Sequence, residues 1–127
     1  MVEILCEKLR TNGFPVDSFY EDEKHFGNIV IKSRLECGVT ISLTKDRGLW
    51  DCHASVGNEE IPIVAMVYLL EGISFEFEEL SFDSDDKLIE WLIVQKNTLS
   101  TLSDESLRET VKKWDILTKE RLKKMMS

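Results

Sequence analysis

The sequence has few of the residues that stabilise small proteins through disulfides or metals. Its three cysteines, Cys6, Cys37 and Cys52, are odd in number and widely spaced, and no Cys-x-x-Cys pair occurs. This pattern excludes a disulfide framework and favours a reducing compartment. The two histidines, His25 and His53, do not stand in a metal-binding pattern such as His-Glu-x-x-His. We therefore expect no metal site and no cofactor.

Long apolar runs are also scarce. The run from Ile61 to Leu70 has ten residues, whereas a membrane-spanning helix needs about twenty. Glu3 and Glu7 interrupt the start of the chain, which lacks the basic and apolar regions of a signal peptide. With two prolines and six glycines among 127 residues, the composition is that of one folded domain over residues 1–127. We expect a cytoplasmic location.

Positive charge is in deficit. Sixteen Lys and Arg residues against twenty-four Asp and Glu residues give a net charge of −8, which disfavours nucleic acid and anionic membranes as partners. The balance is uneven along the chain. Residues 1–103 hold nine basic and nineteen acidic residues (net −10), and residues 104–127 hold seven and five (net +2). The acidic body predicts a basic protein partner.

The first half of the chain changes from helical to strand periodicity. Apolar residues at helical spacing predict a first helix that ends near Gly13. Residues 17–25 are predicted to form a loop or a short irregular strand. Period-two alternation then predicts three strands near residues 29–32, 39–44 and 50–56. Asp46 and Gly48 between the last two strands are typical of a hairpin turn.

The second half is mainly helical. The run 61–70 fits a helix because of Pro62, or a strand because of its Val and Ile content. A short strand is expected within 74–82. A helix that continues to Leu99 follows it, and the Asp-Ser-Asp-Asp sequence of residues 83–86 supplies its N-cap and the acidic residues of its first turn. A last helix starts at residues 103–105. The fold predicted is α+β: an antiparallel β meander of three to four strands packed by an N-terminal helix and two to three C-terminal helices.

No catalytic constellation emerges. Cys52 and His53 are adjacent on a strand and so point to opposite faces, which favours a core cysteine beside a surface histidine. The acidic clusters 21–23, 76–79 and 83–86 could serve acid/base chemistry or bind a cation, but a solvated face or helix cap is the commoner role. Glycine-rich phosphate loops are absent. We therefore expect that this protein is not an enzyme.

The three tryptophans, Trp50, Trp91 and Trp114, fit either of two roles. Tryptophan often dominates the binding energy of a protein interface. Core packing is the expected role of at least two of them, and the pattern leaves the exposure of Trp91 undecided.

Three segments carry a resemblance to a known family: Thr44 to Asp51, with its Asp-Arg-Gly-Leu-Trp sequence, Tyr68 to Gly72, and Leu88 to Leu92. Their order resembles that of the small bacterial immunity proteins of polymorphic toxin systems. The resemblance implies a cytoplasmic inhibitor that binds its cognate toxin directly and does no chemistry. For the Asp-Arg-Gly-Leu-Trp segment, a surface hairpin with a core tryptophan and a recognition role both remain open.

The partner-binding site predicted from the sequence is an acidic rim between the expected strand and the helix after it. Its residues are Glu76, Glu78, Glu79, Asp83, Asp85 and Asp86. Two other classes of function remain open. The chain could be an acidic adaptor or a nucleic-acid mimic that occupies a basic groove, or it could be a small ligand-binding protein or enzyme.

Overall fold

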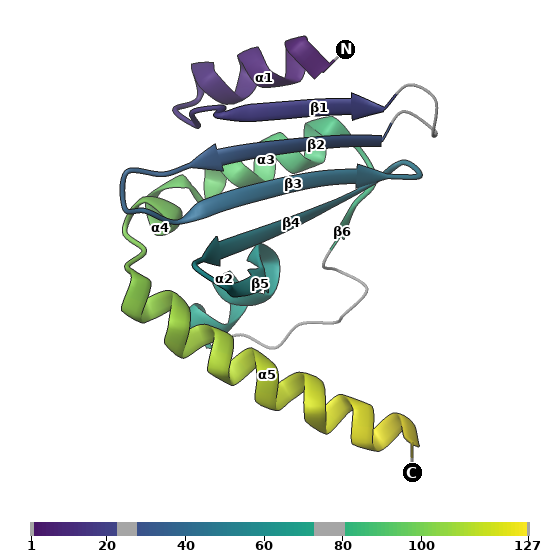
Figure 1. Cartoon of the computed structure of the whole chain (residues 1–127), viewed down its shortest axis with the longest axis vertical. Helices are drawn as coiled ribbons and strands as arrows, with labels where there is room; N and C mark the ends of the chain where they lie inside the picture. The colour runs from purple at the N-terminus through teal and green to yellow at the C-terminus, as the bar shows by residue number, and fades with distance from the viewer. Residues whose placement is uncertain (1, 23–27, 73–80, 127) are drawn as a thin grey trace.

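The computed structural model describes residues 2–22, 28–72 and 81–126, which form an antiparallel sheet with helices packed against it (Figure 1). The elements in chain order are α1 (Val2–Thr11), β1 (Ser18–Asp22), β2 (Asn28–Arg34), β3 (Thr40–Asp46), β4 (Leu49–Val56), β5 (Glu59–Pro62), α2 (Ile63–Glu71), β6 (Ser81–Phe82), α3 (Asp85–Val94), α4 (Lys96–Ser100) and α5 (Asp104–Met126). The predicted α+β class is confirmed.

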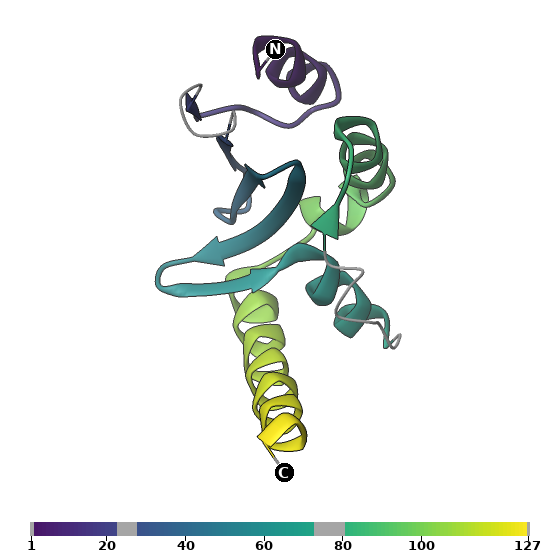
Figure 2. The same cartoon turned by 90° about the vertical axis from the view of Figure 1, so that its right-hand side faces the viewer.

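The sheet is a meander in the order β1-β2-β3-β4-β5, and β6 pairs with the start of β4. The sheet has more strands than the three to four that the sequence predicted, because β1 and β5 add a strand at each of its two edges. Ile31, Leu43 and Cys52 lie opposite one another on adjacent strands, and all three are buried. Alternation places such residues on one face. Figure 2 shows α1, α2 and α3 on that same side of the sheet.

The hairpin predicted between the second and third strands is present. β3 ends at Asp46 and β4 begins at Leu49, so the loop has two residues, Arg47 and Gly48. Their φ angles are 52° and 86°. Two positive φ values in a two-residue loop match the turn whose twist suits antiparallel strands.

The run 61–70, left open between helix and strand, contains both. β5 ends at Pro62, and α2 starts at Ile63 and ends against Gly72, whose φ is 72°. Pro62 has no N–H and a φ of −57°, so it can begin a helix at little cost. The first five residues of α2 are all buried. A helix apolar on all sides at its start is a core element.

The single helix expected up to Leu99 is wrong, because α3 and α4 are separate helices on either side of Gln95. Gln95 has φ −89° and ψ 3°, and its N–H donates to the carbonyl of Trp91 at 3.0 Å. Its own carbonyl accepts from the Leu99 N–H at 2.9 Å. The backbone groups stay paired through the bend, which lets Leu99 reach the core.

Two expected segments fall partly outside the described residues. In the loop or irregular strand at 17–25, residues 18–22 form β1, and 23–25 are not described. In the strand expected within 74–82, Ser81 and Phe82 form β6, and 74–80 are not described.

The last helix, α5, starts where the sequence predicted. Its first turn is capped by Ser103, whose Oγ accepts from the Ser106 N–H at 3.1 Å. Buried residues occur only in its early turns, at Leu107, Thr110 and Val111, where it packs against α2 and β5. The later turns extend beyond the sheet (Figure 1) and end in a lysine-rich segment.

Candidate partner-binding surface

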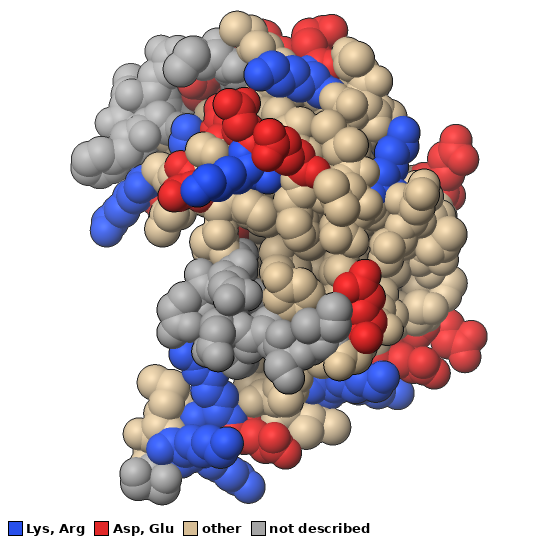
Figure 3. Space-filling model, turned by 180° about the vertical axis from the view of Figure 1, so that it is seen from behind, with Lys and Arg blue, Asp and Glu red and all other residues tan. Residues whose placement is uncertain are grey.

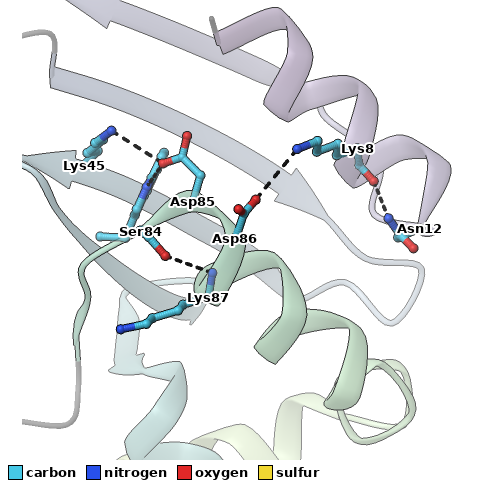
Figure 4. A network of polar contacts seen from close by, with 8 residues as sticks. Lys8, Asn12, Lys45, Ser84, Asp85, Asp86 and Lys87 are labelled. Carbon is cyan, nitrogen blue, oxygen red and sulfur yellow. Dashed lines mark hydrogen bonds and ion pairs between the residues drawn. The ribbon is translucent and has the colours of Figure 1, made fainter.

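The start of α3 brings together the described part of the predicted acidic rim. Ser84 is the N-cap of the helix, and its Oγ accepts a hydrogen bond from the Lys87 N–H at 3.1 Å. Asp85 and Asp86 occupy the first turn, where carboxylates interact favourably with the positive end of the helix dipole. These local rules explain why the sequence folds into a helix at this point (Figure 4).

Asp85 is tied to the sheet. Its Oδ1 accepts a hydrogen bond from Trp50 Nε1 at 2.7 Å and lies 3.5 Å from Lys45 Nζ. Lys45 Nζ also lies 5.8 Å from the centre of the Trp50 ring. Trp50 is fully buried. The carboxylate therefore satisfies a buried indole N–H that would otherwise lack a partner.

The other two acidic side chains point toward solvent. Asp83 Oδ1 lies 2.9 Å from Lys87 Nζ, and this hydrogen bond lowers the pKa of the Asp83 carboxyl. Asp86 is 83% exposed, and its Oδ1 lies 3.8 Å from Lys8 Nζ on α1. This contact joins α1 to α3, which lie side by side. Exposed ion pairs of this kind contribute little to stability.

The six rim residues predicted from the sequence thus divide into three groups. Asp83 and Asp86 are exposed to solvent. Asp85 is engaged by β3 and β4 within the fold. The remaining three, Glu76, Glu78 and Glu79, lie outside the described residues.

The structure adds acidic residues that the rim prediction did not include. Glu7 on α1 and Glu90 on α3 are exposed on the two neighbouring helices. We define the α1–α3 surface by the side chains of Glu7, Asp83, Asp86 and Glu90. The neighbour relation of the two helices was not predictable from either one alone.

Cys52 and His53, the adjacent cysteine and histidine of β4, lie on opposite faces of the sheet. Cys52 is buried, and burial raises the pKa of its thiol. His53 points to the opposite face, where its Nδ1 lies 3.8 Å from Glu60 Oε1. No group of three or more His, Cys, Asp or Glu side chains in these ranges could hold a metal ion.

The described surface has two notable hollows. One, of about 520 Å³, lies between the end of α1 and the β2–β3 turn, and Arg10, Glu36 and Cys37 help to line it. The other, of about 440 Å³, lies on the open face of the sheet and is lined by hydroxyl and charged side chains that include Lys32, Thr44 and Glu60.

Comparisons with models of protein families, with curated proteins and with solved structures find no match to this chain. Within the described ranges, no helix has both the length and the apolar character needed to cross a membrane.

Proposed function

We propose that this chain is a non-enzymatic binding protein that inhibits a basic protein partner by direct contact, in the manner of an immunity protein that neutralises its cognate toxin. The observation that carries the proposal is the separation of charge between the body and α5. Residues 1–103 have a net charge of −10, and residues 104–127 have a net charge of +2. A surface of one sign attracts a partner of the other sign and increases the association rate.

The location of the exposed carboxylates supports a docking role for the α1–α3 surface. Figure 3, which views the molecule from behind, shows acidic side chains with basic ones among them beside a broad area of uncharged side chains, and a further group of basic side chains at the end of α5. Ile4 on α1 and Ile93 and Val94 on α3 are exposed apolar residues. Interfaces commonly combine an apolar centre with a charged rim.

The lysines that contact Asp83 and Asp86 do not prevent a basic partner from binding these two carboxylates. Both pairs are exposed to solvent, where the attraction within a pair is largely screened. A basic partner can compete for these carboxylates without leaving a buried charge unpaired. The ion pair between Lys8 and Asp86 is also long, at 3.8 Å.

The first experiment is co-purification of the chain with the product of the neighbouring gene. The double variant Glu7→Lys/Glu90→Lys then tests the surface, because both residues are exposed and neither lies in the first turn of a helix. The change removes the 3.1 Å ion pair between Glu7 and Arg10, which is exposed and contributes little to stability. Asp83 and Asp86 are poorer test sites because negative charge at the start of α3 also stabilises the helix. We expect about tenfold slower association at low salt, and a smaller salt dependence.

A matched control separates position from total charge. Glu71→Lys/Glu109→Lys makes the same change in net charge at exposed residues of α2 and α5. We expect it to slow association less than the first double variant does. Equal effects of the two double variants would show that only net charge matters, and the α1–α3 surface would lose its role. Failure of the chain to bind any basic partner would contradict the proposed function itself.

A further inference from the structure

The two edges of the sheet differ in how they are covered. At one edge, β5 packs against α2 and α5, and Arg108 Nε on α5 lies 3.9 Å from Glu59 Oε2 on β5. At the other edge is β1, which pairs only with β2 among the described elements. Figure 2 shows α1 on the helical side of the sheet.

The hydrogen bonds of β2 determine which groups of β1 face outward. The Leu35 N–H donates to the Val39 carbonyl at 2.9 Å, in the same register that pairs β2 with β3. Bonding direction alternates along a strand, so the odd-numbered residues of β2 bond to β3 and the even-numbered ones bond to β1. The bond from the Asp17 N–H to the Lys32 carbonyl, at 2.9 Å, agrees with this.

The same alternation applies to β1. Ser18, Tyr20 and Asp22 lie opposite the even-numbered residues of β2 and bond to them. The N–H and C=O groups of Phe19 and Glu21 therefore point away from the sheet. No described hydrogen bond satisfies them. They form a short template to which another strand can bind.

The side chains of β1 are also accessible. Phe19 is 46% exposed and Tyr20 is 62% exposed, on opposite faces of the strand. Edge strands are commonly protected by charged residues, lysine above all, or by proline, and the only such residues within 18–22 are the acidic Glu21 and Asp22. Two exposed aromatic residues beside free backbone groups are the features that a bound strand uses: the backbone supplies hydrogen bonds and the side chains supply specificity.

We propose that the free edge of β1 binds an extended, basic segment of the protein partner, which adds to the sheet as a further strand. This inference rests on the proposed function and gives its contact a location. The charge of residues 17–22 determines which kind of segment this edge binds best. Asp17, Glu21 and Asp22 make residues 17–22 acidic, with no basic residue among them. A lysine- or arginine-rich strand would place cations opposite these residues.

The same charges disfavour a second copy of this chain as the occupant. Pairing of two β1 strands would place two copies of Glu21 and of Asp22 in one short ladder. Like charges across adjacent strands are destabilising. The net charge of −8 on each copy adds a further repulsion.

Hydrogen exchange of individual amides tests the inference without any substitution. In the free chain we expect fast exchange at Phe19 and Glu21 and slower exchange at Tyr20, whose N–H bonds to β2. With the co-purified partner bound, the amides of Phe19 and Glu21 should slow at least tenfold. Unchanged exchange at both residues in a complex that does form would place the partner elsewhere and overturn the inference, while the proposed function would stand.

Substitution at one position isolates the outward N–H. Phe19→Ala removes the aromatic ring and keeps the N–H, and Phe19→Pro removes both. We expect the proline variant to bind the partner on the order of three- to tenfold more weakly than the alanine variant, the effect of one hydrogen bond. Equal affinities of the two variants would count against strand addition. The melting temperature of each variant checks that the fold is kept.

A synthetic peptide of alternating lysine and valine separates this inference from the proposed function. If no protein partner binds, the proposed function fails, and the peptide still decides the role of the edge. Slower exchange at Phe19 and Glu21 on adding the peptide would support it, and no change at millimolar peptide would overturn it. Slower exchange that depends on the concentration of the chain alone would identify a second copy as the occupant and overturn the choice of a basic segment.

Discussion

Trp50 and Asp85, 35 positions apart in the sequence, are joined by a 2.7 Å hydrogen bond from the indole Nε1 to the carboxylate Oδ1. The bond connects the start of β4 to the first turn of α3. It also connects two features of the sequence that looked independent, the Asp-Arg-Gly-Leu-Trp segment and the acidic cluster 83–86. One member of that cluster therefore has a structural role, which separates it from its exposed neighbours.

We expect Asp85→Ala to lower the free energy of unfolding by about 2 kcal/mol, because the buried Trp50 N–H would lose its acceptor. Asp85→Asn keeps an acceptor oxygen and should cost about half as much. Urea unfolding measures both variants. The matched control is Glu90→Ala, which removes an exposed carboxylate from the same helix beyond its first turn and should change stability little. Equal losses for Glu90→Ala and Asp85→Ala would contradict the structural role of the Trp50 bond.

The cap of α3 gives a second stability prediction. Ser84→Ala removes the oxygen that accepts from the Lys87 N–H and should cost about 1 kcal/mol. Ser84→Asp supplies another capping oxygen and should retain most of the stability. Chemical unfolding of the two variants compares them directly. A loss of equal size in Ser84→Asp would mean that the hydroxyl has a role beyond capping.

The turn between β3 and β4 contains a residue in an unfavourable conformation. Arg47 has a φ of 52°, a region that costs a non-glycine residue about 1 kcal/mol. Arg47→Gly should relieve part of this cost and raise the melting temperature. Gly48→Ala should lower it, because φ is 86° there even though no described atom lies within 4 Å of the added methyl group.

The Arg47→Gly variant also tests the recognition role left open for this segment. Unfavourable backbone conformations are often kept at binding sites. A variant that is more stable and binds the partner more weakly would show that Arg47 takes part in recognition. A more stable variant with unchanged binding would leave the segment as a surface hairpin above a core tryptophan.

The elements that the sequence predicted are those governed by local rules. The first helix, the three central strands, the hairpin turn and the start of α5 each depend on periodicity or on a cap a few residues away. The bend at Gln95 was missed because the apolar pattern from Leu88 to Leu99 continues across it. β5 was missed because its four residues are too few for alternation to be visible.

The candidate site was less predictable because its arrangement depends on contacts between residues that are far apart in the sequence. The acidic character of residues 83–86 was visible, but whether a carboxylate faces inward or outward depends on distant residues such as Trp50 and Lys45. The α1–α3 surface depends on the packing of two helices, and all the strands of the sheet lie between these helices in the sequence. The outward-facing groups of Phe19 and Glu21 follow from strand register, which only the fold determines.

The last prediction concerns pH and the buried thiol of Cys52. Burial, with a smaller contribution from nearby Asp51, raises the pKa of this thiol in the folded chain. In the unfolded chain a cysteine ionises above about pH 8.5. Above that pH the unfolded state therefore loses a proton that the folded state keeps, so the unfolded state binds fewer protons. The contribution of Cys52 to stability is complete below about pH 8.5 and is lost as the pH rises further.

We expect the free energy of unfolding to fall by up to about 1.4 kcal/mol per pH unit through this thiol between pH 9 and pH 10. Cys52→Ala should be less stable than the parent at neutral pH, yet its stability should fall less steeply over this range. Burial also raises the pKa of Cys6, so the slope should decrease without vanishing. Ile41→Val is the control, because it deletes a buried methyl group without an ionisable group and should keep the parent slope. Equal slopes for the parent and Cys52→Ala would show that Cys52 does not resist ionisation in the folded chain.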